Sequence, residues 1–299
     1  MTVARNKGFR TDTNYFKPMT LAQALATLRD AFTPVAAEFA LPEAERVLTF
    51  LLDCPRGRLY TGGDDQLPDE TAGRIKRIIA RRTRDEPLAY ILGSAYFYNR
   101  EFAVTPAVLI PRPDTEVLVE EVLTNEPDAR LRFLDLGTGS GCIAAILAQE
   151  RPAWQCIAID RSMPALAVAK MNRRSAFSLV CCDRLEAIKP NRLFDFIVSN
   201  PPYIPATAIP KLPGSVRGFE PLDALDGGVD GLDYYRYCAD SAMVLLKKDG
   251  RIYCEIGYDQ ADAVMGIFCG RGWSDVIMRK DLGNQPRVVR ALWPKGQGI

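Results

Sequence analysis

Asn200, Pro201, Pro202 and Tyr203 follow directly after the apolar run FDFIVS. Such a run is typical of a buried strand, and proline can end a strand because it supplies no backbone donor to the ladder. If the motif only ended the strand, Asn200 and Tyr203 would be incidental. The prolines also fix the backbone so that the Pro201 carbonyl points into a cleft. With the Asn200 side-chain oxygen it forms two acceptors for a planar NH2 group, on which Tyr203 can stack.

An amide or exocyclic amine nitrogen is a weak nucleophile, because its lone pair is delocalised. In-line transfer of a methyl group from a sulfonium requires alignment of nitrogen with methyl, and acceptors that favour the charge building on nitrogen. No strong base is needed first. The motif therefore predicts methyl transfer to a planar NH2 group. Adenine or cytosine in nucleic acid and the side-chain amide of glutamine both fit, and the motif alone does not choose between them.

A second group of residues lies where another strand turns into a helix. In the segment DLGTGSG, Gly137, Gly139 and Gly141 leave room for a ligand to approach the backbone. Asp160 ends the next strand, where a carboxylate can accept both hydroxyls of a ribose or simply cap a helix. The spacing GxGxG departs from the GxGxxG of dinucleotide sites and resembles S-adenosylmethionine-dependent methyltransferases. In that family Asp183, at the third strand end, lies where the adenine amino group is contacted.

The composition excludes several other chemistries. The chain of 299 residues has no histidine, which excludes a Ser-His-Asp triad, a His general base and a His-ligated zinc site. Its eight cysteines show no CxxC spacing, so we expect reduced thiols in a cytoplasmic protein and no metal site. A formal net charge of +1 provides no field toward nucleic acid or an anionic membrane. No apolar run reaches the roughly 18 residues that span a bilayer.

Alternating strands and helices position both groups of residues. Apolar strands are predicted at 131–137, 155–160, 178–183, 194–200 and 251–257, with two more near the C-terminus. Helices are predicted between them, at 140–150, from Ser162 to about 173, and at 231–248. This pattern predicts an α/β fold, a Rossmann-like domain with a mainly parallel seven-stranded sheet. Such sheets bind ligands at the carboxyl ends of their strands, where both groups lie.

The remaining chain predicts two further parts. Residues 1–18 lack the apolar core of a signal peptide and are expected to be a disordered tail. Residues 19–86 predict a small helical bundle, with helices within 20–53, a loop at 60–68 and a helix at 69–84. The six basic residues between 74 and 84 form either a docking face or a solvated helix face. Residues 87–113 predict a β-hairpin connector that opens a catalytic domain running to residue 299.

Several motifs occur in a fixed order. They are EPLAYILG (86–93), VTPAVLIPRPDTEVLVE (104–120), LDLGTGSG, VSNPPYI, FEPLDALDGGVDGL (219–232), EIGYDQ (255–260) and KDLGNQPRV (280–288). From about residue 20 onward the chain thereby resembles the HemK/PrmC family, the peptide chain release factor glutamine methyltransferases. A sister family that methylates a ribosomal-protein glutamine shares NPPY, but it usually carries a different motif in place of IPRPDTE.

The resemblance implies methyl transfer from S-adenosyl-L-methionine to the glutamine of the GGQ motif in class I release factors. It implies an N-terminal domain that docks the release factor, and we expect a monomer. It assigns the glutamine substrate to Asn200, Pro201, Pro202 and Tyr203, with Asn200 also beside the cofactor. The implied cofactor residues are Gly137, Thr138, Gly139, Ser140, Gly141, Asp160, Asp183 and Arg184, and the cleft wall is formed by Phe102 and residues 104–116. The 172–183 stretch is shorter than the family's usual connection.

Two other hypotheses stay open at this point. A nucleic-acid amine methyltransferase would carry a basic, aromatic recognition region, against which the near-neutral charge and the small N-terminal bundle argue. We therefore expect no stable nucleic-acid binding and no membrane association. A non-enzymatic assembly factor that only binds the cofactor is the other hypothesis, and the intact Asn200 and Pro201 argue against it.

Overall fold

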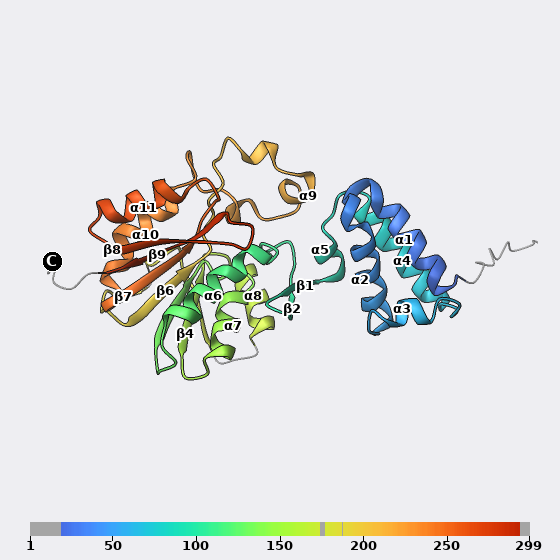
Figure 1. Ribbon diagram of the computed structural model, residues 1–299, viewed down its shortest axis with the longest axis horizontal. Coiled ribbons are helices and arrows are strands. Elements are labelled where there is room, and N and C mark those ends of the chain that lie inside the picture. The colour runs from blue at the N-terminus through green and yellow to red at the C-terminus, as the bar shows by residue number, and fades with distance from the viewer. Residues whose placement is uncertain (1–18, 174–176, 187, 294–299) are drawn as a thin grey trace, which may run out of the picture. The chain divides into compact units, whose positions relative to one another are not determined.

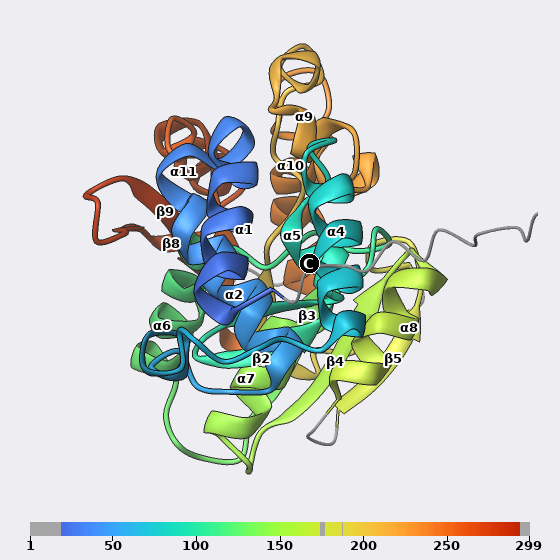
Figure 2. The same cartoon turned by 90° about the vertical axis from the view of Figure 1, so that its right-hand side faces the viewer.

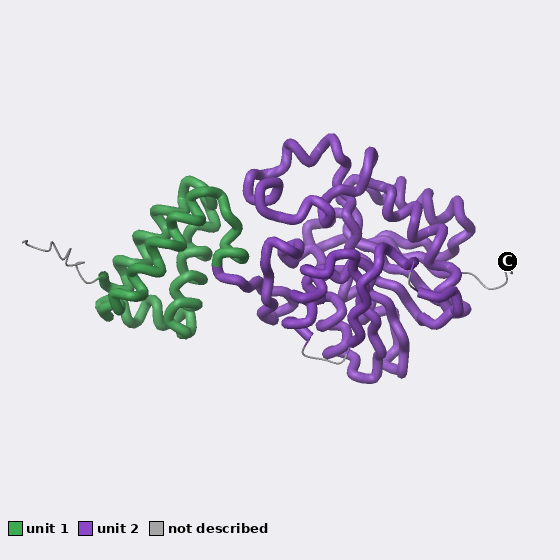
Figure 3. The backbone as a smooth tube through the Cα atoms, turned by 180° about the vertical axis from the view of Figure 1, so that it is seen from behind, with its two compact units in different colours: residues 1–91 green, residues 92–299 purple. Residues whose placement is uncertain are grey.

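The computed structural model describes residues 19–173, 177–186 and 188–293. The chain divides into two compact units, residues 1–91 and 92–299, which are coloured separately in Figure 3. The tail predicted at 1–18 lies outside the described residues, as do residues 174–176 of the 172–183 stretch.

The first unit is a helical bundle. Its elements are α1 (Leu21–Ala36), η1 (Ala37–Phe39), α2 (Ala40–Leu52), α3 (Arg58–Thr61), α4 (Asp69–Arg82) and α5 (Leu88–Leu92). Helix α1 begins in a capping box, in which the Gln23 N–H donates to Thr20 Oγ1 and the Thr20 N–H donates to Gln23 Oε1. Leu28, Phe32 and Leu48 are fully buried between the helices. The helices predicted within 20–53 and at 69–84 are confirmed, and α3 extends into the predicted loop.

The second unit is built on a seven-stranded sheet with the order β5-β4-β3-β6-β7-β9-β8 (Figure 1). The strands are β3 (Arg132–Leu136), β4 (Gln155–Asp160), β5 (Phe177–Cys181), β6 (Phe194–Ser199), β7 (Leu246–Glu255), β8 (Ser274–Lys280) and β9 (Pro286–Leu292). The pairs from β5 to β7 are parallel, whereas β9 is antiparallel to β7 and β8. The predicted α/β fold with a mainly parallel sheet is confirmed. The strand order reverses between β3 and β6, where open sheets bind ligands.

Helices cover both faces of this sheet (Figure 1 and Figure 2). Helices α6 (Glu116–Asn125) and α7 (Cys142–Glu150) lie on one face, with α8 (Met163–Asn172) beside α7. Helices α10 (Asp233–Ser241) and α11 (Ala261–Gly270) lie on the other. Because side chains alternate across a strand, Phe133 packs toward α6 and α7 while Leu134 packs toward α10 and α11. Phe133 stacks on Phe196 with ring centroids 4.9 Å apart.

Two predicted segments differ from the structure. The sequence predicts a helix over 231–248, but α10 ends at Ser241 and, after the turn η5 (Ala242–Val244), β7 begins at Leu246. Leu246 is fully buried and pairs with Phe194 of β6, so strand pairing overrides the helical propensity of LLKK. The hairpin predicted over 87–113 is limited to β1 (Ser94–Phe97) and β2 (Arg100–Ala103), because α5 precedes it.

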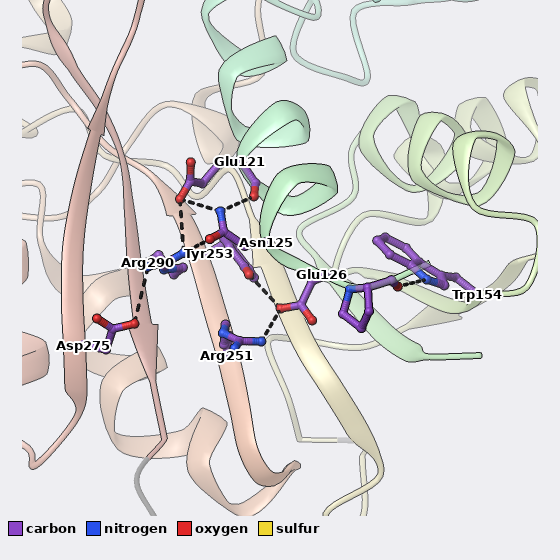
Figure 4. Close-up of polar contacts among 9 residues, drawn as sticks. Glu121, Asn125, Glu126, Trp154, Arg251, Tyr253, Asp275 and Arg290 are labelled. Atoms are coloured by element: carbon purple, nitrogen blue, oxygen red, sulfur yellow. Dashed lines mark hydrogen bonds and ion pairs between the residues drawn. The ribbon is translucent and has the colours of Figure 1, made fainter. Parts of the chain in front are cut away.

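Helix α6 is tied to the antiparallel part of the sheet by a buried polar network (Figure 4). Glu126, which follows the helix, accepts hydrogen bonds from the Tyr253 hydroxyl at 2.7 Å and from the Arg251 guanidinium at 3.1 Å. On the preceding turn, the Glu121 carboxylate lies 3.6 Å from the Arg290 guanidinium of β9. This network fixes α6, and with it the residues at its start, against the sheet.

Three features of the described residues bear on the class of the protein. No helix among them is both long and apolar enough to cross a membrane. No group of His, Cys, Asp or Glu side chains in the same residues is arranged to hold a metal ion. All eight cysteines are free, and burial raises the pKa of the Cys142 thiol to about 12. Cys142 is therefore an unreactive core thiol at neutral pH.

Candidate active site

A cavity of about 580 Å³ opens at the carboxyl ends of β3, β4, β5 and β6, within the second unit. Small-molecule pockets commonly have volumes of about 300–1,000 Å³. Of the residues proposed from the sequence, the wall includes Gly137, Thr138, Gly139, Ser140, Asp160, Asp183, Arg184, Asn200 and Pro202. Gly141, Pro201, Tyr203 and Phe102 do not belong to this wall. The glycine loop (residues 137–141) and residues 200–203, called the Asn200 corner below, therefore both contribute to one cavity.

Three glycines in the loop after β3 have left-handed backbone conformations. The angle φ is 75° at Gly137, 54° at Gly139 and 77° at Gly141, values that side chains with a Cβ rarely adopt. The Gly137 N–H donates to the Ile159 carbonyl at 2.9 Å, which ties the loop to β4. At Gly141 a Cβ would lie 3.1 Å from that of Ala169, whereas a Cβ at Gly139 would meet open space. Gly141 thus serves the packing of α7 on α8, and Gly139 faces the cavity.

Asp160 braces this loop from the end of β4. Its Oδ2 accepts from the Gly139 N–H at 2.8 Å, and its Oδ1 accepts from the Ser162 N–H at 2.9 Å. Each carboxylate oxygen can accept more than one hydrogen bond, so both retain capacity for a ligand. The Ser162 hydroxyl accepts from the Ala165 N–H at 3.2 Å, which confirms Ser162 as the cap of α8. The bracing role and a ribose-binding role are therefore compatible.

Asp135 supports the same loop from beneath and is fully buried. Its Oδ2 accepts from the Thr138 hydroxyl at 2.6 Å and from the Ala144 N–H at 3.2 Å. Its Oδ1 is buried without a hydrogen-bond partner among the described residues. Burial raises the pKa of Asp135 to about 7, because the charged form is poorly solvated there.

Arg184 follows Asp183 after the end of β5 and packs on two tyrosines of α10. Its guanidinium lies 4.7 Å from the ring centroid of Tyr237 and 5.8 Å from that of Tyr234, in the range of cation–π contacts. Tyr234 also lines the cavity, and burial raises the pKa of its hydroxyl. Sequence reasoning gives Tyr234 no role, because an aromatic residue on an amphipathic helix usually belongs to a core.

The Asn200 corner is supported by buried polar groups. Asn200 Nδ2 donates to Thr115 Oγ1 at 3.1 Å, and Thr115 is only 2% exposed. The Tyr203 hydroxyl donates to Glu255 Oε1 at 3.4 Å, and the Tyr203 carbonyl accepts from Gln260 Nε2 at 2.9 Å. Tyr203 packs against the core and does not belong to the cavity wall. Tyr203 thus lies beside Glu255, and its stacking on a bound NH2 group stays a prediction.

The segment between β2 and α6 forms one wall of the cavity. Its contributing residues are Ala107, Val108, Leu109, Pro111, Arg112 and Thr115. Phe102, by contrast, is 4% exposed and packs edge-on against Phe97 at a centroid distance of 6.2 Å. This packing corrects the expectation that Phe102 walls the cleft, because its position in β2 turns the ring toward the core.

A second wall comes from residues 221–228, a role that sequence reasoning misses. Gly227 approaches the corner so closely that a Cβ there would lie 2.9 Å from the Pro202 carbonyl oxygen. Just before this segment, the buried Glu220 accepts from the Arg112 guanidinium and from the Ile110 N–H, the latter at 3.4 Å. The two walls are thereby joined. The paired glycines in DALDGG are the sequence signal for this close approach.

The fold and the cavity define the class of protein first. Residues 113–210 match the family model described as the methyltransferase small domain. The catalytic domain of hMettl16, solved in complex with MAT2A 3'UTR hairpin 6, has a similar fold with a TM-score of 0.52 and 17% identity. That likeness covers 77% of this chain and 84% of that chain. The second unit is therefore a methyltransferase domain.

More similar relatives identify the family. Residues 21–93 match the PrmC N-terminal domain. The chain is 40% identical to the release factor glutamine methyltransferase of Geobacter sulfurreducens, over 90% of this chain and 95% of the relative. It is 42% identical to that of Koribacter versatilis, over 88% of this chain and 97% of the relative. The chain belongs to the release factor glutamine methyltransferase family, which confirms the resemblance seen in the sequence.

Proposed function

We propose that this protein transfers a methyl group from S-adenosylmethionine to the side-chain amide nitrogen of the GGQ glutamine in class I release factors. One observation carries the proposal. Asn200 borders the same cavity as the glycine loop, and its Nδ2 is engaged by Thr115, so its Oδ1 is the atom left for a ligand. A substrate NH2 group requires an acceptor of this kind. The name shared by the relatives supports the choice of glutamine over a nucleic-acid base.

The residues of the cavity fit S-adenosylmethionine. Gly137 and Gly139 leave room for close approach to the backbone, which suits the methionine portion of the ligand. Asp160 has free acceptor capacity for the ribose hydroxyls, and Asp183 lies in the cavity wall, where it can accept from the adenine amino group. When bound, S-adenosylmethionine supplies a methyl group activated by its sulfonium.

The chain itself aligns and stabilises the nucleophile. In this mechanism Asn200 Oδ1, in the cavity wall, accepts one hydrogen of the glutamine NH2 group and holds its nitrogen in line with the methyl group. We propose the Pro201 carbonyl as the second acceptor, although Pro201 itself lies outside the wall. Positive charge builds on that nitrogen as it attacks, and the two acceptors strengthen their hold at that moment. No strong base is required first, which suits a chain without histidine.

The N-terminal helices have a separate role in the proposal. We propose that residues 19–86 dock the release factor and that residues 87–299 carry out the transfer. The match of residues 21–93 to the PrmC N-terminal domain supports this division. We place the enzyme in the cytoplasm as a monomer, because translation termination takes place there and the proposed site needs no second copy.

A labelling experiment tests the proposal. The full chain is incubated with S-adenosylmethionine labelled in its methyl group and, in parallel, with a class I release factor, ribosomal proteins or nucleic acid. We expect label in the release factor alone, and none when the GGQ glutamine is replaced by alanine. Mass spectrometry should find one added CH2 unit on that glutamine. Label that enters only nucleic acid or only a ribosomal protein would reject the proposed substrate.

A further inference from the structure

Tyr234 of α10 borders the cavity, but the proposed mechanism gives it no part. It is one of three tyrosines on this helix, and the hydroxyls of the other two are engaged by the protein. The Tyr235 hydroxyl donates to the Glu255 carbonyl at 2.8 Å, and the Tyr237 hydroxyl accepts from the Leu185 N–H at 3.0 Å. The Tyr234 hydroxyl makes no hydrogen bond with the described residues, so it is available to a ligand in the cavity.

The hydroxyl end of Tyr234 lies beside the glycine loop. Among the described atoms, only the Tyr234 hydroxyl oxygen comes within 4 Å of the point where a Cβ of Gly137 would stand, at 3.8 Å. Gly137 borders the same cavity and directly follows β3. A ligand that approaches the backbone at Gly137 therefore meets the hydroxyl as well.

The ring of Tyr234 lies on the side of β5. The Arg184 guanidinium, which follows the end of β5, is 5.8 Å from the centroid of the ring. In the sheet β4 lies between β5 and β3. The side chain of Tyr234 therefore extends along the edge of the sheet, from Arg184 after β5 to Gly137 after β3.

The surroundings of the hydroxyl keep it neutral. Burial raises the pKa of Tyr234 most, followed by Cys238 and Asp160, and Asp183 also raises it, whereas Arg184 lowers it. A neutral hydroxyl can both donate and accept hydrogen bonds, whereas the ionised carboxylates of Asp160 and Asp183 can only accept. The hydroxyl thus offers a donor between groups that offer only acceptors.

The order of the strands gives the order of the proposed contacts along the cofactor. Asp183 after β5 is proposed to bind the adenine, Asp160 of β4 the ribose, and the glycine loop after β3 the methionine portion. The Tyr234 hydroxyl lies at the level of the third contact, next to Gly137. The methionine portion ends in an ammonium and a carboxylate, and hydrogen bonds to charged groups of this kind are the strong ones.

We infer that Tyr234 is a further cofactor-binding residue, whose hydroxyl hydrogen-bonds to the methionine portion of S-adenosylmethionine. The inference rests on the cofactor proposed above. It adds a side chain from α10, on the face of the sheet opposite α6 and α7, to a site otherwise assigned to strand ends and the loops that follow them.

Calorimetry with three ligands tests the inference on the full chain. S-adenosylmethionine and S-adenosylhomocysteine both carry the amino-acid group, whereas 5′-methylthioadenosine keeps the adenosine and the sulfur but lacks that group. Tyr234→Phe removes only the hydroxyl. We expect it to raise the dissociation constants of the first two ligands by about tenfold, the effect of one lost hydrogen bond to a charged group. The dissociation constant of 5′-methylthioadenosine should stay within about twofold of the wild-type value.

The matched control is Tyr258→Phe, at a tyrosine that is 63% exposed and lies outside the cavity wall. It should bind all three ligands as the wild type does. Thermal unfolding shows whether Tyr234→Phe is folded. If it is not, Tyr234→Leu decides, because this change also removes the hydroxyl. A greater loss of affinity for S-adenosylhomocysteine than for 5′-methylthioadenosine then supports the inference, and an equal loss overturns it.

Two results with a folded Tyr234→Phe would overturn the inference. One is a dissociation constant for S-adenosylmethionine equal to that of the wild type. The other is an equal weakening of all three ligands, which would place the hydroxyl at the adenosine.

Binding also separates this inference from the proposed function. If the wild type binds S-adenosylmethionine but does not methylate a release factor, the proposed function fails and the calorimetric series still tests Tyr234. If the wild type binds none of the three ligands, the proposed cofactor fails and the inference is overturned with it.

Discussion

Replacing Asn200 by alanine tests the corner directly. The change removes Oδ1, the proposed acceptor for the substrate NH2 group, together with the Nδ2 donor to Thr115. Loss of one preorganised contact to a developing charge raises the barrier by about 3–4 kcal/mol, which corresponds to about 10²–10³ in kcat. The lost bond to Thr115 lowers the free energy of unfolding by only about 1 kcal/mol, against roughly 5–15 kcal/mol for a folded domain. We therefore expect a folded, slow enzyme.

Single-turnover methylation of a release factor at saturating S-adenosylmethionine measures this barrier, and calorimetry measures the cofactor dissociation constant. We expect the rate to fall while cofactor affinity largely survives, because the glycine loop and Asp160 are untouched. Asn191→Ala, at an exposed asparagine outside the cavity wall, is the control and should behave as the wild type. An Asn200→Ala rate close to that of Asn191→Ala would refute the role of the corner. If cofactor affinity fell as much as the rate, Asn200 would instead be assigned to cofactor binding.

Other parts of the site give further predictions. Asp160→Ala should weaken S-adenosylmethionine binding by about tenfold to a hundredfold, as expected for lost hydrogen bonds to a charged group. A dissociation constant equal to that of the wild type, measured by calorimetry, would contradict the placement of Asp160 beside the cofactor. Arg112→Met leaves the buried Glu220 carboxylate without its ion pair, so the free energy of unfolding measured in urea should fall by about 1–3 kcal/mol. An unchanged free energy of unfolding would show that the ion pair does not stabilise the fold. The raised pKa of Asp135, about 7, means that the folded state binds its proton more tightly than the unfolded state. Its contribution to stability is therefore lost as pH rises from about 4 through 7, and Asp135→Asn should flatten that slope in unfolding measured against pH.

The strands and the glycine loop could be predicted from the sequence because their signals are local. A buried strand, its turn and the following helix lie within about twenty residues, so apolar runs and glycines indicate them directly. The left-handed angles at Gly137 and Gly139 follow from the same short segment. The helix expected to reach residue 248 failed because pairing of Leu246 with Phe194, far away in the chain, decides that segment.

The supports of the site could not be predicted because they join distant segments. Thr115 and Asn200 are 85 residues apart, and Arg112 and Glu220 are 108 apart. No periodicity or spacing shows which of the many polar residues will meet after folding. For the same reason the sequence places Phe102 in the cleft, although the register of β2 turns its ring into the core.

The two halves of the cavity rest on buried carboxyl groups of the same kind. Asp135 lies beneath the glycine loop and Glu255 beneath the Asn200 corner, and each has one buried oxygen without a partner among the described residues. Such groups lower the stability of a fold, because a buried acceptor loses its water. Glu126, buried away from the cavity, has partners in Tyr253 and Arg251. In the described part of the chain, buried polar atoms without hydrogen-bond partners also occur away from the cavity, in Arg82, Gln149, Arg151 and Arg290, so such atoms are not confined to the site. Asp135 holds the glycine loop through Thr138 and Ala144, and Glu255 holds Tyr203 of the Asn200 corner.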